Sequence, residues 1–139
     1  MTDRFDLQRF VEAQAPIYSK VCEELRAGRK ESHWMWFIFP QIAGLGQSPT
    51  SVKFAISSLD EALAYLAHPV LGPRLLECSR LALEVEGRTA RQIFGVVDEL
   101  KFRSSMTLFA GAAREPAVFR QCLDKYFGGA PDRATLAKL

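Results

Sequence analysis

The stretch SHWMWFIFPQIAGLG, residues 32–46, decides how the rest of the sequence is interpreted, because it places six large apolar side chains in a row. This apolar run is too short to cross a bilayer, which takes about 20 apolar residues. Aromatic and branched residues favour strands, but Ser32 is a good N-cap and Pro40 ends the run. The stretch therefore predicts a short helix that is chiefly core, with His33 and Gln41 beside it as the place for a site.

The composition is that of one globular domain covering residues 1–139. Hydrophobic residues make up 48% of the chain and charged residues 24%. Eighteen basic residues against 16 acidic ones give a net charge of +2. Because this charge is small and no long basic run accompanies it, we expect neither a nucleic acid nor a membrane surface as the partner.

The N-terminus and the cysteines favour a cytoplasmic protein. Residues 1–10, MTDRFDLQRF, are charged from the third residue onward and lack the apolar core of a signal peptide. The three cysteines, Cys22, Cys78 and Cys122, are odd in number and have no metal-ligand spacing. Each falls among apolar helix positions, so we expect buried thiols, no metal and no cofactor.

The local signals along the chain are helical nearly everywhere. Helix starts are indicated at Ser58, which forms a capping box with Glu61, and at Thr89 and Asp98. No segment alternates convincingly between apolar and polar residues over six positions. Apolar stripes at helical spacing are Leu59/Leu63/Leu66, Leu75/Cys78/Ala82/Val85, Phe102/Met106/Phe109 and Val118/Cys122/Tyr126. The sequence thus predicts an all-α fold, a single compact domain of seven or eight short helices.

The segment GLGQSPTS, residues 44–51, is the first candidate for a binding site. Gly44 and Gly46 allow a close approach of the backbone, and Ser48 followed by Pro49 is typical of a helix start. A glycine loop that leads into a helix N-terminus can bind an anion such as phosphate. The spacing matches neither of the two common phosphate-binding fingerprints, so a plain loop before a capped helix is the alternative interpretation.

The second candidate is His33 together with Trp34, Trp36 and Gln41. A histidine can act as an acid, a base or a phosphate partner, and an indole offers a flat face to a ring. On a helix the two tryptophans point about 200° apart, so at most one lines the same cavity as a given polar group. Core packing is the alternative for each of them. Gln41, in apolar surroundings, needs a hydrogen-bond partner from the backbone or from a ligand.

The third candidate is DELKFRSSMTLFAG, residues 98–111. Lys101, Ser104 and Ser105 share one side of the predicted helix. A lysine beside serines is suited to holding a phosphate, and a Ser–Lys nucleophile pair is the catalytic version of this arrangement. The spacing matches no Ser–Lys enzyme family. Asp98 is the one helical neighbour of Lys101 that could pair with it.

Four segments in order carry a resemblance to a known family: SHWMWFIFPQIAGLG, AISSLDEALAYLAHPVLGPRL, the region from IFG to LKFRSSMTLFA, and LDKYFGG. From about Phe5 to Leu139 the chain resembles an uncharacterised bacterial family, the domain of unknown function DUF1810. The resemblance implies one mostly helical domain and no particular activity. Members have often carried the label calpastatin. That label does not fit a chain with 10 Phe, 3 Tyr and 2 Trp, because calpain-inhibitor segments are disordered and polar.

Three functions remain open at this point. The domain could bind a small anionic ligand through the loop and Lys101, with His33 or a tryptophan on its ring and with catalysis by His33 as an extension. A looser similarity of the HPVLGPRL and K-F segments to proteins that process ADP-ribose-linked metabolites adds ADP-ribose to nucleotides as ligands to test. The alternatives are a protein–protein interaction module with an aromatic surface, whose partner is unknown, and a purely structural helical domain.

Each of the three functions makes a different demand on the structure. Anion binding requires His33, Gln41 and Lys101 to converge on a concave, partly apolar pocket. An interaction module requires an exposed apolar patch well beyond a few hundred Å². A purely structural domain requires neither of these features.

Overall fold

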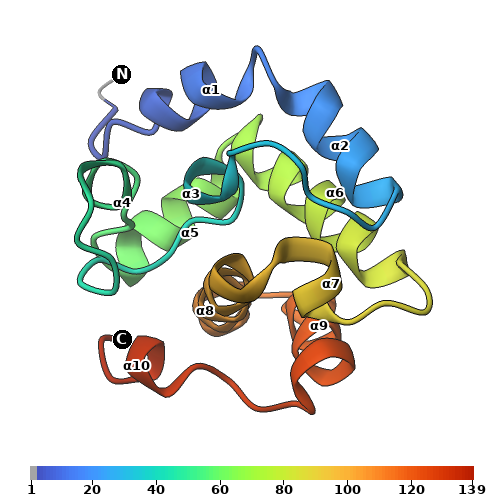
Figure 1. The fold of residues 1–139 in the computed structure, drawn as a ribbon. Coiled ribbons are helices and arrows are strands. Elements are labelled where there is room, and N and C mark those ends of the chain that lie inside the picture. The colour runs from blue at the N-terminus through green and yellow to red at the C-terminus, as the bar shows by residue number, and fades with distance from the viewer. Residues whose placement is uncertain (1–2) are drawn as a thin grey trace.

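The computed structural model describes residues 3–139, and over this range it is almost entirely helical (Figure 1). The expected all-α fold is therefore confirmed. Four of the ten helices have only four or five residues, and these single turns raise the number above the seven or eight expected. The helices are α1 Gln8–Gln14, α2 Tyr18–Arg26, α3 Met35–Ile38, α4 Pro49–Lys53, α5 Leu59–Ala67, α6 Leu71–Glu84, α7 Ala90–Phe94, α8 Val96–Ala112, α9 Ala117–Phe127 and α10 Arg133–Leu136.

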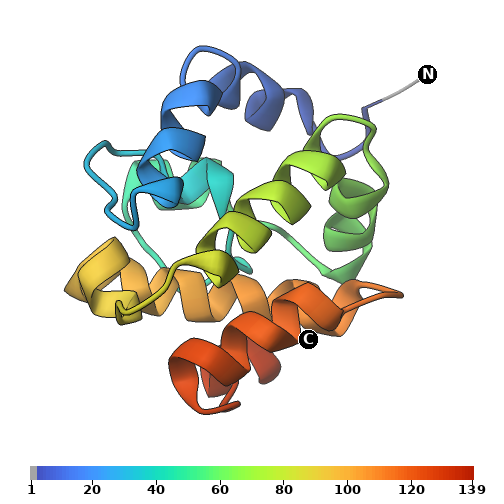
Figure 2. The same cartoon turned by 90° about the vertical axis from the view of Figure 1, so that its right-hand side faces the viewer.

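Two long helices, α6 and α8, organise the packing of the others. Helix α6 packs against α2, α5 and α9, whereas α8 packs against α5, α7, α9 and α10. Figure 2 shows α8 and α9 side by side, with α6 crossing above them. Large aromatic side chains fill the space between these layers, and the fully buried ones include Phe10, Trp34, Phe39, Phe102, Phe109 and Phe119. No helix within residues 3–139 is long and apolar enough to cross a membrane.

The aromatic run of residues 34–39 is core, as its sequence predicts. Only its middle forms a helix, the single turn α3. Phe39 packs edge-on against Phe102 of α8, with ring centroids 5.0 Å apart. Trp36 and Phe37 remain half-buried. Ser32 does not cap this helix, because Trp34 occupies the N-cap position and the Ser32 hydroxyl donates to Glu24 instead.

The predicted start of α5 is right, but its predicted buried face is wrong. The Ser58 hydroxyl accepts from the Glu61 backbone N–H at 3.2 Å, as in a capping box. The Glu61 carboxylate, however, accepts from Ser57 rather than from Ser58, and its other oxygen pairs with Arg9. Ala62 and Tyr65 face the core, where α6 and α8 pack. The expected stripe residues Leu59 and Leu63 are 36% and 45% exposed.

Of the N-caps predicted for α7 and α8, the first is confirmed and the second is wrong. Thr89 and Gln92 form a reciprocal capping box at α7, so the predicted cap is confirmed. Asp98 does not cap α8, because the helix begins two residues earlier, at Val96, with Gly95 as its N-cap. The carboxylate of Asp98 is thereby free to bind side chains from elsewhere in the chain.

Candidate functional site

Residues from two of the predicted candidates meet at one hollow in the surface. Trp36 of α3 and the loop after it form its walls, and the region around α4 closes it. The hollow has room for about one water molecule as it stands. Its lining consists of Trp36, Gln41, Ile42, Gly44, Gly46, Ser51, Phe54 and Ala55. Trp36, Gln41, Gly44 and Gly46 belong to two of the predicted candidates. His33 and Lys101, which the sequence predicted to converge with Gln41, are not among the lining residues.

A pair of backbone hydrogen bonds fixes the loop that carries this hollow. Ile42 and Ile56 form an isolated parallel bridge. The Ile56 N–H donates to the Gln41 carbonyl at 2.8 Å, and the Ala43 N–H donates to the Ile56 carbonyl at 2.8 Å. The Gln41 carbonyl is therefore satisfied within the protein, and Gln41 also lines the hollow.

Gly44 brings a basic side chain from the C-terminus to the same loop. Its φ of +96° lies in the left-handed region that favours glycine. A Cβ atom at this position would lie only 2.9 Å from Lys138 Nζ, so the Lys138 ammonium group rests against the glycine. Figure 1 shows the chain after α10 returning beneath this loop.

A cluster of charges lies beside Trp36, outside the lining of the hollow. Lys101 Nζ lies over the Trp36 ring, 4.9 Å from its centre, and 3.8 Å from Asp98 Oδ1. Lys30 Nζ lies 2.9 Å from Asp98 Oδ2, and the Lys30 side chain is only 8% exposed. One carboxylate therefore sits between two ammonium groups, which leaves an excess of positive charge beside Trp36.

Trp34 has a structural role that excludes it from a surface site. Its indole N–H donates to Glu24 Oε1 at 3.0 Å, and its side chain is fully buried. The same carboxylate accepts from the backbone N–H groups of Glu31 and Ser32 and from the Ser32 hydroxyl. Burial alone would raise the pKa of Glu24, but these four donors outweigh it and lower the pKa to about 2.

The remaining candidate residues at this end of the chain lie outside the hollow. His33 is exposed and is not part of its lining. Ser48 caps α4, where its hydroxyl accepts from the Ser51 N–H at 3.1 Å. Because α4 is only five residues long, its N-terminus has little dipole to offer an anion.

The two serines of α8 do not lie free beside Lys101. The Ser104 hydroxyl is 3.0 Å from the Leu100 carbonyl oxygen and 3.2 Å from Asp132 Oδ2, where it helps to hold the start of α10. Ser105 is fully buried, and its hydroxyl has no hydrogen-bond partner in the part of the chain that the structure describes. Neither hydroxyl is placed to contact a ligand on the surface.

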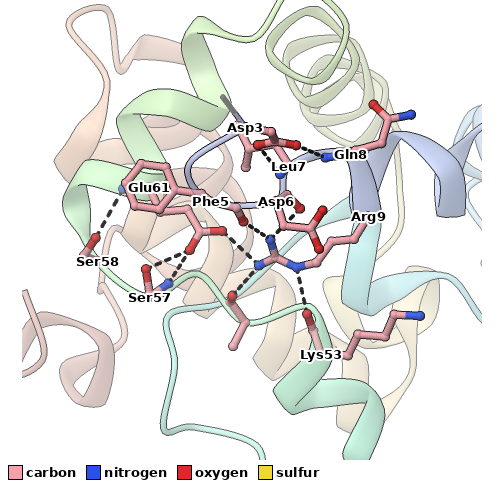
Figure 3. A network of polar contacts seen from close by, with 11 residues as sticks. Asp3, Phe5, Asp6, Leu7, Gln8, Arg9, Lys53, Ser57, Ser58 and Glu61 are labelled. Carbon is pink, nitrogen blue, oxygen red and sulfur yellow. Dashed lines mark hydrogen bonds and ion pairs between the residues drawn. The ribbon is translucent and has the colours of Figure 1, made fainter. Parts of the chain in front are cut away.

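Sequence reasoning missed the guanidinium of Arg9, which fastens the N-terminal segment to the region around the hollow (Figure 3). All five of its N–H bonds are used, four on carbonyl oxygens and one on Glu61. Nothing in the spacing of these residues signals the arrangement, because its parts come from three separate segments. The acceptors are Phe5 O, Asp6 O, Lys53 O, Ala55 O and Glu61 Oε2, at 2.5 to 2.9 Å.

Metal-ligating residue types do not gather at the hollow or elsewhere in the described chain. Within residues 3–139, no group of three or more His, Cys, Asp and Glu side chains could hold a metal ion. The chemistry available at the hollow is therefore that of ammonium groups, an indole face, an amide and glycine backbone.

The comparisons with known proteins agree with this fold. The model of a family described as "Protein of unknown function (DUF1810)" matches residues 4–139. The chain belongs to the DUF1810 family. A solved structure with the same fold is the crystal structure, at 1.38 Å, of the conserved hypothetical protein Rv1873 from Mycobacterium tuberculosis. It is 59% identical to this DUF1810 chain, the match covers 99% of this chain and 98% of that one, and the TM-score is 0.98. The search of curated proteins gave no match.

Proposed function

We propose that this protein binds a small anionic metabolite, a nucleotide or an ADP-ribose-type compound, at the hollow beside Trp36. The observation that carries the proposal is the contact between Lys101 and Trp36, which places a cation over an aromatic ring whose residue also lines the hollow. In this account the ammonium groups hold the phosphate and the exposed part of the indole contacts the ring of the ligand.

The charges around the hollow support an anion rather than a cation. Lys30 and Lys101 outnumber the single carboxylate of Asp98, and Lys138 adds a third ammonium group at Gly44. The backbone N–H groups of residues 44 and 46 donate to no acceptor within residues 3–139. In the proposed complex, a phosphate at Gly44 lies between the Lys138 ammonium group and these backbone donors.

We also propose a bacterial cytoplasmic location and a partner that is neither a nucleic acid nor a membrane. The three free cysteines support a location in the bacterial cytoplasm. The net charge of +2 supports neither a nucleic acid nor a membrane as partner. Because His33 is exposed and outside the hollow, it contacts a bound ligand only where the ligand extends beyond Trp36.

An interaction module is the second candidate, and a different surface favours it. The aromatic run is mostly buried, so it offers little area to a protein partner. At the start of α8, Val96, Val97 and Leu100 are 60%, 66% and 59% exposed. A protein partner of this domain would contact this apolar turn of α8 rather than the aromatic residues.

The proposal is tested by thermal unfolding with ADP-ribose, NAD, nucleotides, sugar phosphates and inorganic phosphate. A ligand at 100 times its Kd adds about 2.7 kcal/mol to the free energy of unfolding, which raises Tm by several degrees. Lys101→Ala should abolish the rise, because it removes the ammonium group that holds the phosphate. Lys20→Ala, an exposed lysine on α2, is the matched control and should behave as wild type. A Tm that rises equally in Lys101→Ala, or that rises for no compound, would exclude this site.

A further inference from the structure

A second and larger hollow, which we call the α9–α10 groove, is lined by residues of α8, α9, α10 and the link between the last two. Helices α9 and α10 both pack against α8, and they lie on either side of it in Figure 1. The groove has a volume of about 330 Å³, at the lower end of the roughly 300–1,000 Å³ of small-molecule sites. It shares no lining residue with the hollow beside Trp36. Its size suits a ligand as small as an amino acid.

Part of the lining of the α9–α10 groove is apolar. Ala110 of α8, Leu123 of α9 and Leu136 of α10 all contribute to it. Leu136 is 49% exposed, so this leucine still presents apolar surface to water. Gly111 of α8 also lines the groove and adds no side chain to fill it. An aliphatic group that enters the groove removes apolar surface from water, which favours its binding.

Two opposite charges lie in the same groove. Arg120 and Asp124 both line it, and they are one turn apart on the same face of α9. Both residues are exposed, and within residues 3–139 neither side chain forms an ion pair. A base placed four residues before an acid is the less favourable order for a helical ion pair. Both charges therefore remain available to a ligand.

Gly129 makes room for the Asp124 carboxylate beside the segment that leads to α10. A Cβ atom at residue 129 would lie 3.0 Å from Asp124 Oδ1, so this oxygen rests against the glycine. At the preceding glycine, Gly128, a Cβ atom would meet nothing within 4 Å. The position of the carboxylate thus depends on glycine at residue 129 and not on glycine at residue 128.

We propose that the α9–α10 groove binds a free α-amino acid with an aliphatic side chain. The Arg120 guanidinium donates to the carboxylate of the ligand, because its planar fork matches two carboxylate oxygens. The Asp124 carboxylate accepts from the ammonium group of the ligand, and the aliphatic side chain lies against Leu123 and Leu136. A ligand with only one of the two charges leaves the other protein charge unpaired, so the groove selects a zwitterion. This site is independent of the anion site proposed beside Trp36.

The test is titration of the full-length protein with L-leucine, followed in a proton–nitrogen NMR spectrum through the backbone signals of Gly111 and Gly129. We expect both signals to shift and to saturate. The analogues 4-methylpentanoate and 3-methylbutylamine keep the side chain of leucine but lack its ammonium or its carboxylate group. Each should bind about tenfold more weakly, because one hydrogen-bonded charge is lost. The proposal is overturned if leucine moves neither signal, or if either analogue binds as tightly as leucine.

Substitutions of the two charged residues test their roles separately. Arg120→Gln and Asp124→Asn should each weaken leucine binding about tenfold, for the same reason. Arg80→Gln, at an exposed position of α6, is the matched control and should bind leucine as wild type does. Unchanged affinity in folded Arg120→Gln or Asp124→Asn would show that the groove does not recognise a zwitterion.

The two glycines provide a second matched pair of variants. Gly128 and Gly129 have φ values of +62° and +79°, so alanine strains the backbone at either position. Only Gly129→Ala crowds the Asp124 carboxylate, and it should weaken leucine binding about fivefold, whereas Gly128→Ala should not. A circular-dichroism spectrum confirms that each variant is folded before titration. Equal leucine affinities of the two folded variants would contradict the role of Asp124.

Discussion

The Lys101 ammonium group lies over the face of Trp36, 4.9 Å from the ring centre, and is held there by Asp98. This contact joins two segments that are far apart in the chain, the aromatic run of residues 32–46 and the start of α8. Because Lys30 pairs with the other oxygen of Asp98, the arrangement is fixed from both sides. Lys101 is therefore held over the ring of Trp36, a residue that also lines the hollow with the glycine loop.

Glu24 should make the stability of the protein depend on pH in the acidic range. Its pKa is about 2 in the folded protein against an ordinary value of 4.5, which corresponds to about 3 kcal/mol. Because the folded pKa is the lower one, this contribution is present above pH 4.5 and is lost as the pH falls towards 2. We expect Glu24→Gln to lower the free energy of unfolding at pH 7 by about 3 kcal/mol and to flatten its decline below pH 5.

The measurement for Glu24 is chemical denaturation as a function of pH. Glu23→Gln, at the exposed neighbouring position of α2, is the matched control and should follow the wild-type curve. Parallel pH curves for Glu24→Gln and wild type would show that this carboxylate does not hold residues 31–34 in place.

Arg9 should contribute to stability through the shape of its side chain rather than through its charge. Its guanidinium donates to four carbonyl oxygens and to Glu61, in a fork that an ammonium group cannot reproduce. We therefore expect Arg9→Lys to cost about 2 kcal/mol in a urea denaturation experiment. Arg26→Lys makes the same substitution at an exposed position of α2 and should change the free energy of unfolding little. Equal effects of the two substitutions would contradict this role for Arg9.

Gly72 should be the glycine that tolerates substitution least. A Cβ atom there would lie 2.1 Å from the Leu66 carbonyl oxygen, so α5 and α6 could not keep their present approach. We expect Gly72→Ala to lower the free energy of unfolding by several kcal/mol, about 3 or more, or to prevent folding. Gly111→Ala makes the same change in α8, where the nearest atom is Leu139 Cδ1 at 3.4 Å, and should stabilise by up to about 1 kcal/mol. Thermal unfolding of both variants compares the two positions directly.

Gly44 should matter for binding beyond its backbone conformation. Gly44 and Gly87 both have positive φ, at +96° and +72°, so alanine at either position should cost about 1–2 kcal/mol of stability. At Gly87 a Cβ meets nothing within 4 Å, whereas at Gly44 it meets Lys138 Nζ. We expect only Gly44→Ala to weaken anion binding, by at least fivefold in calorimetry. Equal affinities of the two alanine variants would remove the loop from the site.

The all-α fold could be predicted from the sequence because its signals are local. Helix caps such as Ser58 and Thr89 depend on neighbouring residues, and both lie where the sequence places them. The face of α5 could not be predicted in the same way. Leu59 and Leu63 are as apolar as core residues, and only the position of α6 and α8 decides that Ala62 and Tyr65 are buried.

The candidate site shows the same division between local and long-range information. Trp36, Gln41, Gly44 and Gly46 could be selected because they lie within one short stretch. Lys138 and Arg9 could not, because their partners are in segments distant along the chain. The role of Glu24 could have been predicted, because this acid lies among the apolar positions of α2. Its neighbours Val21, Cys22 and Leu25 are core residues.

The most direct test of the proposed site is the indole N–H region of a proton–nitrogen NMR spectrum during titration with ADP-ribose and with inorganic phosphate. The chain has two tryptophans. The buried Trp34 indole N–H donates a hydrogen bond to Glu24, so its signal serves as an internal control. We predict that the Trp36 signal shifts and saturates, that the Trp34 signal stays in place, and that Lys101→Ala abolishes the shift. A Trp36 signal that does not move, or that moves equally in folded Lys101→Ala, would contradict anion binding at this site.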